Sequence, residues 1–198
     1  DEMSQDDIRQ FSKMIHDSSK NLLNLLENLL EWSVLEQNKR HCKPEKTNLS
    51  EIIRKNIELF SPNCKKKGLS MANKVSPDTE VWADQNMVDT VVRNLSSNAI
   101  KYTPEGGTIS YHSQSNDTHV TLEITDTGVG MDETTLNQLF KLEELRSRPG
   151  TGNEKGTGLG LLICRELIEK NNGTIEVKST LGEGSTFIIT LPKHPHNL

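Results

Sequence analysis

Three polar side chains in the middle of the chain, Asn94, Asn98 and Lys101, have types and a spacing that could hold a charged ligand. The surrounding residues 86–102 contain neither Gly nor Pro and repeat apolar residues at helical intervals, so we expect a helix. Steps of four and three residues then put the two amides and the ammonium on one helix face. A metal-bound phosphate would satisfy amide oxygens and a cation together. A solvated helix face is the alternative explanation, and the rest of the chain decides between the two.

Two glycine-rich stretches follow and could bring backbone close to such a ligand. An expected strand ends at the stretch Asp126-Thr-Gly-Val-Gly-Met, whose glycines permit a tight turn. The Asp126 carboxylate either contacts a ligand or only caps this turn. Gly156-Thr-Gly-Leu-Gly-Leu runs directly into an expected helix, and the N–H groups at a helix N-terminus bind anions. The second stretch lacks a preceding strand and a Gly-Lys-Ser/Thr sequence, which excludes a dinucleotide-binding fold and a P-loop.

Alternating helices and strands are expected to position these stretches. Asn48 and Asp84 are expected N-cap residues of two helices; Pro62 would kink or end the first, and Gly68 would close it. Further helices are predicted over 132–140 and 159–170, and strands over 69–75, 79–82, 108–113, 118–125, 174–179 and 185–191. Residues 41–47 are interpreted as a polar linker and Lys141 to Lys155 as a long functional loop.

The N-terminal stretch 4–41 predicts one long helix, because it holds no Gly or Pro and repeats apolar residues in heptads. The a and d positions are Ile8, Phe11, Ile15, Leu22, Leu25, Leu29 and Trp32. Further leucines widen this stripe to the width of a four-helix bundle, so we expect a dimer; packing on the chain's own globular domain is the alternative. The expected boundaries are 1–43 for the helix, 44–192 for the globular domain and 193–198 for a tail.

Composition excludes several classes of protein. The 198 residues carry a net charge of -5 with both signs intermixed, which argues against a nucleic-acid surface. Three separated cysteines indicate neither a disulfide framework nor a zinc site. The most apolar run, 22–35, is interrupted by polar residues, so no membrane contact is expected, and there is no signal peptide. Because the chain starts at Asp1 without an initiator Met, we expect a segment of a longer protein.

Four stretches together resemble the ATP-binding domain of sensor histidine kinases. In the order of that family's N, G1 and G2 boxes and final hairpin, they are Asn94 to Thr103, Asp126 to Gly130, Gly156 to Leu161 and Gly182 to Phe187. Phe140 stands in the place of the F box, and the resemblance covers residues 46–191. Residues 29–36 resemble the second helix of the family's dimerisation and histidine-phosphotransfer hairpin.

This resemblance implies an α/β (α+β) two-layer sandwich, with a mixed sheet of about five strands backed by three helices and a long bundle-forming helix at the N-terminus. ATP would lie between the central helix and a lid over 141–155, with Mg²⁺ held by Asn98 and supported by Asn94 as the catalytic residue. The residues expected to bind ATP are Asn94, Asn98, Lys101, Tyr102, Asp126, Gly128, Gly130, Met131, Gly156, Thr157, Gly158, Leu159, Gly160 and Thr186.

The resemblance also implies a role for several of these residues. Asp126 would accept a hydrogen bond from the adenine amino group, and Thr186 would assist at the adenine edge. Gly128 and Gly130 would leave room for the base. Lys101 and the residues from Gly156 to Gly160 would meet the phosphates. Tyr102 would line the nucleotide, with a plain core position as the alternative.

The residue at position 94 bears on the reaction. Gyrase-type and Hsp90-type ATPases of the same fold have a Glu there to activate water, whereas the Asn94 amide cannot take up a proton near neutral pH. The resemblance therefore implies a kinase that transfers the γ-phosphate of Mg-ATP to a histidine. An ATP hydrolase of the same fold and a degenerate nucleotide-binding module are the alternatives.

Partners and location follow from the same resemblance. The expected partners are a second copy of the chain and a response-regulator receiver domain, with no nucleic acid. The expected location is cytoplasmic, and any inner-membrane anchor would belong to the rest of the parent protein.

The phosphate-accepting histidine is expected upstream of Asp1. His16-Asp17 is the only His followed by an acid, but Ser19 and Asn21 stand where the acceptor motif has a basic residue and a Pro. No Gly or Pro between 17 and 39 could turn an acceptor helix back into a hairpin. A divergent acceptor at His16 is the alternative.

Overall fold

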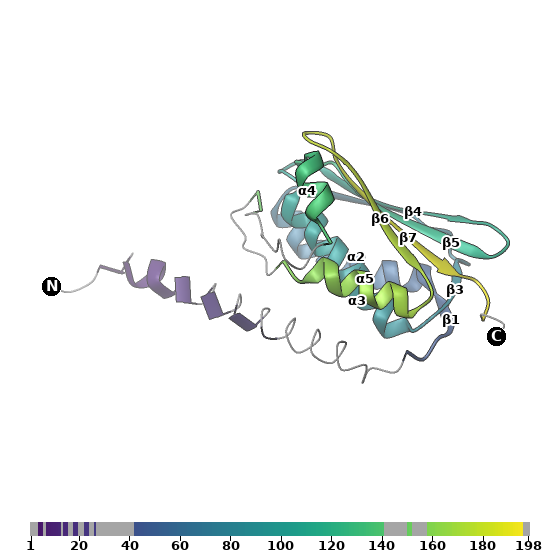
Figure 1. Ribbon diagram of the computed structural model, residues 1–198. Helices are drawn as coiled ribbons and strands as arrows, with labels where there is room; N and C mark the ends of the chain where they lie inside the picture. The colour runs from purple at the N-terminus through teal and green to yellow at the C-terminus, as the bar shows by residue number, and fades with distance from the viewer. Residues whose placement is uncertain are drawn as a thin grey trace.

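A mixed sheet of five strands forms one layer of the computed structural model (Figure 1). The structure describes residues 42–140, 150–151 and 158–195, together with 4, 5, 7–12, 14, 15, 18, 19, 22, 23 and 26. The strands are β2 (Ser70–Lys74), β4 (Thr108–Ser115), β5 (His119–Asp126), β6 (Thr174–Thr180) and β7 (Gly184–Pro192). Their order is β2-β4-β5-β7-β6, with β2 parallel to β4 and the other neighbours antiparallel.

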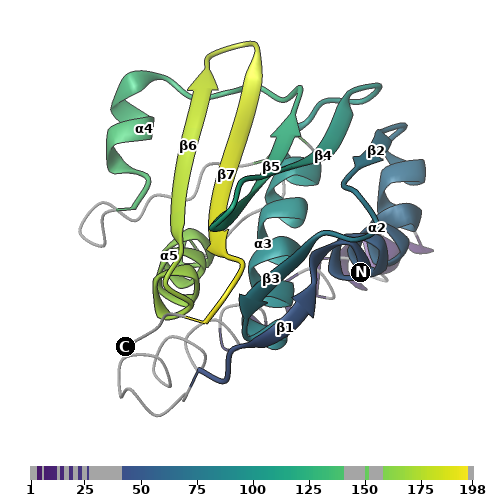
Figure 2. The same ribbon diagram turned by 90° about the vertical axis from the view of Figure 1, so that its right-hand side faces the viewer.

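Helices α2 (Leu49–Lys66), α3 (Gln85–Tyr102) and α5 (Gly160–Lys170) lie on one face of this sheet (Figures 1 and 2). Side chains along β5 alternate between buried and half-buried, as expected for a sheet with one covered face. A short helix, α4 (Glu133–Gln138), lies near the turn between β6 and β7. The predicted two-layer sandwich, its mixed sheet and its three backing helices are therefore confirmed.

Side-chain caps mark the starts of three helices, two of them at the predicted cap residues Asn48 and Asp84. Asn48, Asp84 and Asp132 each accept a backbone N–H from the first turn of α2, α3 and α4, respectively. Each such cap stabilises a helix by about 1 kcal/mol. The starts of α2 and α3 are confirmed, whereas α4 and α5 each begin one residue later than expected, at Glu133 and Gly160, and α4 ends at Gln138 instead of Phe140.

The core is organised around α3, which packs between α2 and α5. All seven apolar residues of its predicted stripe are buried: Met87, Val88, Val91, Val92, Leu95, Ala99 and Ile100. Each large apolar side chain buried in this way contributes roughly 1.5–3 kcal/mol. A buried hydrogen bond also joins this helix to the sheet. The fully buried Tyr111 of β4 donates its hydroxyl to Ser96 Oγ at 2.9 Å. Burial raises the pKa of Tyr111 to about 12, so this donor stays protonated.

Two details of the expected organisation are wrong. Residues Glu45–Asn48, within and beside the expected linker, form strand β1, which pairs antiparallel with β3 (Glu80–Ala83). Thr47 is buried there and donates its hydroxyl to Ala83 O at 2.9 Å. This pairing involves residues about 35 positions apart, so local composition does not indicate it. Helix α2 also continues past Pro62 to Lys66, so of the two alternatives expected for this residue, a kink or an early end, the early end is wrong.

Near the N-terminus, residues 5, 7–12, 14, 15, 18, 19, 22, 23 and 26 are helical. Their large apolar side chains are exposed, for example Phe11 and Leu22 at 53% and 70%. Leu25, Leu29, Trp32, His16 and the stretch 29–36 lie outside the described residues. Within the part of the chain that the structure describes, no helix is both long and apolar enough to cross a bilayer.

Candidate functional site

The side chain of Asn94 lies where α3 meets the start of α5. Its Nδ2 donates to Thr90 O at 3.2 Å, which fixes the amide on the helix surface. A Cβ atom added to Gly160 would lie 3.0 Å from Asn94 Oδ1, so the backbone of α5 approaches this oxygen closely. Asn98, one turn further along α3, is half-buried. The fold therefore brings the polar face of the central helix to the second glycine-rich stretch, as the sequence predicts.

Lys101 and Tyr102 form the last turn of α3. Lys101 Nζ lies 4.8 Å from the centroid of the Tyr102 ring, within the range of a cation–π contact. Both residues are half-buried beside the apolar stripe rather than within it. Tyr102 O accepts the backbone N–H of Val129 at 3.1 Å. The end of α3 therefore lies against the loop that follows Asp126.

Asp126 is a buried carboxylate at the end of β5, with 5% of the residue exposed. Burial raises its pKa to about 6, and the backbone N–H groups of Gly128 and Ser185 act in the opposite direction. The N–H of Gly128 lies 2.8 Å from Asp126 Oδ1. The described bonds to this carboxylate thus come from the backbone, and a donor on a ligand would further stabilise its ionised form.

The glycines of this loop are required by backbone packing. Gly130 has a φ of +63°, and a Cβ there would overlap the carbonyl of Thr180. A Cβ on Gly128 would lie 2.7 Å from Tyr102 O, and one on Gly184 would overlap the carbonyl of Asp126. The family resemblance implies that Gly128 and Gly130 leave room for a base. The structure gives an independent reason, and the contact with a base stays a prediction.

The structure separates Thr186 from Asp126. Thr125 and Thr186 are opposite each other on β5 and β7, and their hydroxyl oxygens lie 3.0 Å apart. Because successive side chains of a strand point to opposite faces, this pair lies on the face away from Asp126 and Ser185, the next pair in the register. This register argues against the expectation that Thr186 lies at the adenine edge beside Asp126, and its role toward adenine stays a prediction. Ser185, which the sequence analysis missed, occupies the buried face instead.

The first turn of α5 has features that suit the expected anion site, whose occupancy stays a prediction. Gly158 has a φ of +81°, a conformation that glycine adopts readily, and it directs the chain into the helix. Leu159 is the N-cap, so no side chain caps the first turn. The N–H groups and the dipole of this turn therefore favour an anion. Gly156 and Thr157, and residues 141–149 and 152–155 of the expected lid, lie outside the described residues.

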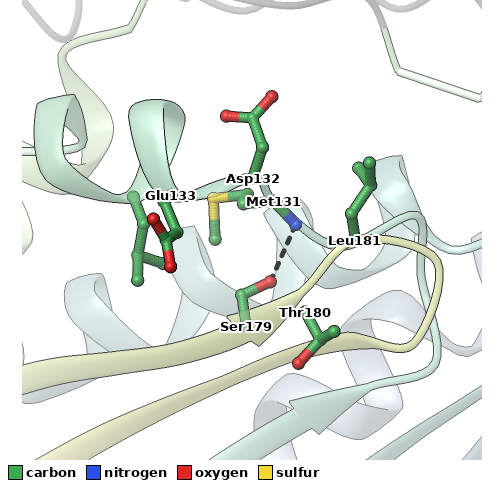
Figure 3. A pocket seen from close by; sticks show the side chains of 7 residues that line it. Met131, Asp132, Glu133, Ser179, Thr180 and Leu181 are labelled. Atoms are coloured by element: carbon green, nitrogen blue, oxygen red, sulfur yellow. Dashed lines mark hydrogen bonds between the residues drawn. The ribbon is translucent and has the colours of Figure 1, made fainter.

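A cavity of about 260 Å³ lies between α4 and the β6–β7 turn (Figure 3). Its lining residues are Met131, Asp132, Glu133, Leu136, Ser179, Thr180 and Leu181. The backbone N–H of Met131 donates to Ser179 Oγ at 2.9 Å (Figure 3). Ser179 in turn donates to Gly184 O at 2.8 Å. These bonds fix the loop against the hairpin.

Comparison with known proteins identifies the family. The family model described as "Histidine kinase-, DNA gyrase B-, and HSP90-like ATPase" matches residues 83–195. The solved catalytic domain of histidine kinase ThkA, in a nucleotide-free form, has a TM-score of 0.67 and is 30% identical, over 76% of this chain and 96% of that domain. The chain belongs to the histidine kinase catalytic domains of this ATPase family.

Other histidine kinases are similar over nearly the whole chain. The autoinducer 2 sensor kinase/phosphatase LuxQ of Vibrio harveyi is 31% identical over 197 residues, which are 96% of this chain and 23% of LuxQ. Full-length ShkA in complex with AMPPNP has a TM-score of 0.77 at 25% identity, over 97% of this chain and 40% of ShkA. ThkA in complex with the response regulator TrrA has a TM-score of 0.77 at 26% identity, over 98% and 53%. The chain thus spans about a quarter of LuxQ.

The predicted family and fold are confirmed by these comparisons. The roles of single residues toward nucleotide stay predictions. The geometry brings Asn94 to Gly160 and the end of α3 to the Asp126 loop.

Proposed function

We propose that this histidine kinase domain binds Mg-ATP between α3 and the first turn of α5 and transfers the γ-phosphate to a histidine outside the chain. The observation that carries the proposal is the position of Asn94, whose amide faces the backbone of Gly160. An anion bound by the first turn of α5 would lie next to this amide. AMPPNP, an ATP analogue, is present in the complex of the related ShkA.

The two ends of the nucleotide would meet different parts of the site. Asp126, buried and held by backbone N–H groups, offers an acceptor to the adenine amino group. Lys101 and the N–H groups at residues 158–160 offer positive charge and donors to the phosphates. Tyr102 links the two ends, because its carbonyl binds the Asp126 loop and its ring lies beside the Lys101 ammonium.

Mg²⁺ fits the donors that α3 presents. It prefers oxygen ligands and is usually bound by few protein groups together with phosphate oxygens and water. The half-buried Asn98 would provide one amide oxygen, with Asn94 one turn away as support. The ion would neutralise charge on the β- and γ-phosphates during transfer.

Phosphate transfer to a protein nucleophile is favoured over hydrolysis because Asn94 offers no base for water. An amide has no proton affinity near neutral pH. The site therefore orients ATP and leaves the nucleophile to be supplied from outside. Sustained phosphate release without any phosphoprotein would instead support the hydrolase alternative.

We further propose a cytoplasmic dimer that passes phosphate to a response-regulator receiver domain. The exposed apolar residues near the N-terminus, such as Phe11 and Leu22, favour pairing with a second copy. The related ThkA is known in complex with the response regulator TrrA.

Calorimetric titration with ATP and Mg²⁺ tests the binding step directly. A saturable signal that depends on Mg²⁺ is expected. The absence of binding would favour the degenerate module.

A further inference from the structure

The carbonyl groups at the end of α3 accept hydrogen bonds from several parts of the chain. The last four carbonyls of a helix have no partner within a continuing turn. Ala99 O accepts the N–H of the C-cap residue, Thr103, at 3.0 Å. Tyr102 O accepts from Val129 at 3.1 Å, and Lys101 O accepts both the N–H and the hydroxyl of Thr151, each at 3.0 Å.

Lys67 binds the two carbonyls in the middle of this turn. Its Nζ lies 2.6 Å from Ile100 O and 3.1 Å from Lys101 O. A cation at a helix C-terminus also interacts favourably with the helix dipole, and hydrogen bonds from charged donors are the stronger kind. Lys67 follows α2, so this ammonium joins the end of one helix to the end of the next.

The backbone of Lys67 is held in place by the way α2 ends. Gly68, with a φ of +63°, donates its N–H to Lys65 O at 3.2 Å, and Leu69 donates to Cys64 O at 2.9 Å. These two bonds form the Schellman arrangement that closes many helices. Lys65 and Lys66 are exposed, whereas Lys67 is half-buried. Of three consecutive lysines, the helix end therefore directs the third toward α3.

We propose that Lys67 is a positioning residue for the phosphate end of the nucleotide site, an inference that rests on the proposed function. Its ammonium fixes the last turn of α3, and that turn carries Lys101. A binding group that is displaced by even a small distance loses much of its interaction with the ligand. Lys67 acts through Lys101 and does not itself bind the nucleotide.

The adenine end should depend on Lys67 less than the phosphate end does. Asp126 is held by the pairing of β5 with β7 and by its own loop. Loss of Lys67 should therefore weaken ligands that carry phosphates and spare ligands that lack them. A general loss of folding would weaken both kinds equally.

The test uses Lys67→Met, which keeps the length of the side chain and removes its charge and donors. Lys65→Met and Lys66→Met are matched controls, and Lys67→Arg restores a cation with several donors. Binding of ATP with Mg²⁺ and of adenosine is measured by calorimetry on each chain, together with the melting temperature. Hydrogen exchange at Val129 and Thr151, which donate to the same turn, reports on local structure.

For Lys67→Met we expect ATP affinity to fall about tenfold and adenosine affinity to change less than about twofold. Lys67→Arg should recover most of the ATP affinity, the controls should match the wild type, and exchange at Val129 and Thr151 should accelerate in Lys67→Met. Equal losses for ATP and adenosine, or unchanged ATP affinity, would overturn the proposal.

Two features keep the test decisive. If Lys67→Met does not fold, Lys67→Gln, which keeps a neutral donor, is compared with Lys67→Arg. Equal ATP affinities of these two variants would also overturn the proposal. Failure of the proposed function is seen separately, because the wild-type chain would then not bind ATP at all.

Discussion

Asp126 is a buried carboxyl group that water hydrates poorly. Burial raises its pKa to about 6, even though the N–H groups of Gly128 and Ser185 act against this shift. The ionised carboxylate therefore costs free energy in the chain without ligand. A ligand that donates a hydrogen bond to it recovers part of this cost, as the adenine amino group would.

The stability of the unliganded chain should fall as pH rises past the ordinary range of a carboxyl group. The folded-state pKa of Asp126, about 6, lies above the unfolded value near 3.8, so the folded state binds this proton more tightly. The resulting stabilisation is fully present below pH 3.8 and is lost as pH rises through 6, by about 2–3 kcal/mol. Urea unfolding between pH 4 and 7 measures it. The difference between wild type and Asp126→Asn isolates this group, and a difference independent of pH would contradict the prediction.

Adenine recognition should depend on Asp126 and not on Thr186. A hydrogen bond to a charged acceptor contributes about 1.5–3 kcal/mol, so Asp126→Asn should weaken ATP binding roughly 10- to 150-fold. Thr186→Val is the matched variant on the neighbouring strand. In the wild type, the Thr186 hydroxyl pairs with that of Thr125 on the sheet face away from Asp126. Its ATP affinity, measured by calorimetry, should stay within about twofold of wild type. A large loss in Thr186→Val would return this residue to the site.

The sequence predicts which residue types surround the site but not all of their orientations. Phe187, Ile189 and Leu191 alternate along β7, and extending that alternation back by two residues selects Ser185 rather than Thr186 for the buried face. This signal was present in the sequence. The requirement for Gly130 was not, because it depends on the carbonyl of Thr180, some 50 residues away.

Helix α3 is held at its N-terminus as well as at its C-terminus. Asp84 caps the helix through Oδ1 and accepts the N–H of Lys43 through Oδ2 at 3.1 Å. Its own N–H donates to Asn171 Oδ1 at 2.6 Å, and Asn171 Nδ2 donates to Leu167 O at 2.8 Å. One buried amide thus joins the chain entering the domain, the start of α3 and the end of α5.

Asn171→Ala should destabilise the chain by about 2–3 kcal/mol, because it leaves the N–H of Asp84 without this acceptor and Asn171 is 1% exposed. Asn137→Ala on α4 is the matched control, since Asn137 is exposed and should change stability by less than about 0.5 kcal/mol. Chemical denaturation of both variants provides the measurement. Similar stabilities for the two variants would refute the role given to this amide.

The first turn of α5 should respond to phosphate and not to the base. Leu159 offers no side-chain cap, so the N–H groups of residues 160–162 are suited to bind an anion. Their hydrogen exchange should slow in ATP with Mg²⁺ and stay unchanged in adenosine. Protection by adenosine alone would place the phosphates elsewhere.

At the scale of the whole molecule, most elements of the domain could be predicted because their signals are local. Capping residues mark the helix starts, and alternation marks strands such as β5. Strand β1 was missed because its only signal is its partner, β3. The sheet order also depends on long-range pairing, and the resemblance to histidine kinases, rather than periodicity, supplied the expected sandwich.

The chain should not phosphorylate itself, because none of its histidines stands in the acceptor motif of the histidine kinase family. His16-Asp17 lacks the basic residue and the Pro of the family's acceptor motif. Residues 17–39 also contain no Gly or Pro to form the turn that must follow an acceptor helix. Incubation with radiolabelled ATP and Mg²⁺ should therefore leave this chain unlabelled.

A longer protein that includes the upstream helix is the control for this last prediction. It should become labelled, and the label should be acid-labile, as expected for a phosphohistidine. A longer protein in which Asn98 is replaced by Ala should not label itself. If the present chain is catalytically competent and lacks only the acceptor histidine, adding this chain should restore labelling of that variant. Acid-labile label on the present chain, lost in His16→Ala, would place the acceptor at His16 and would require the helix to turn back without the residues that usually allow it.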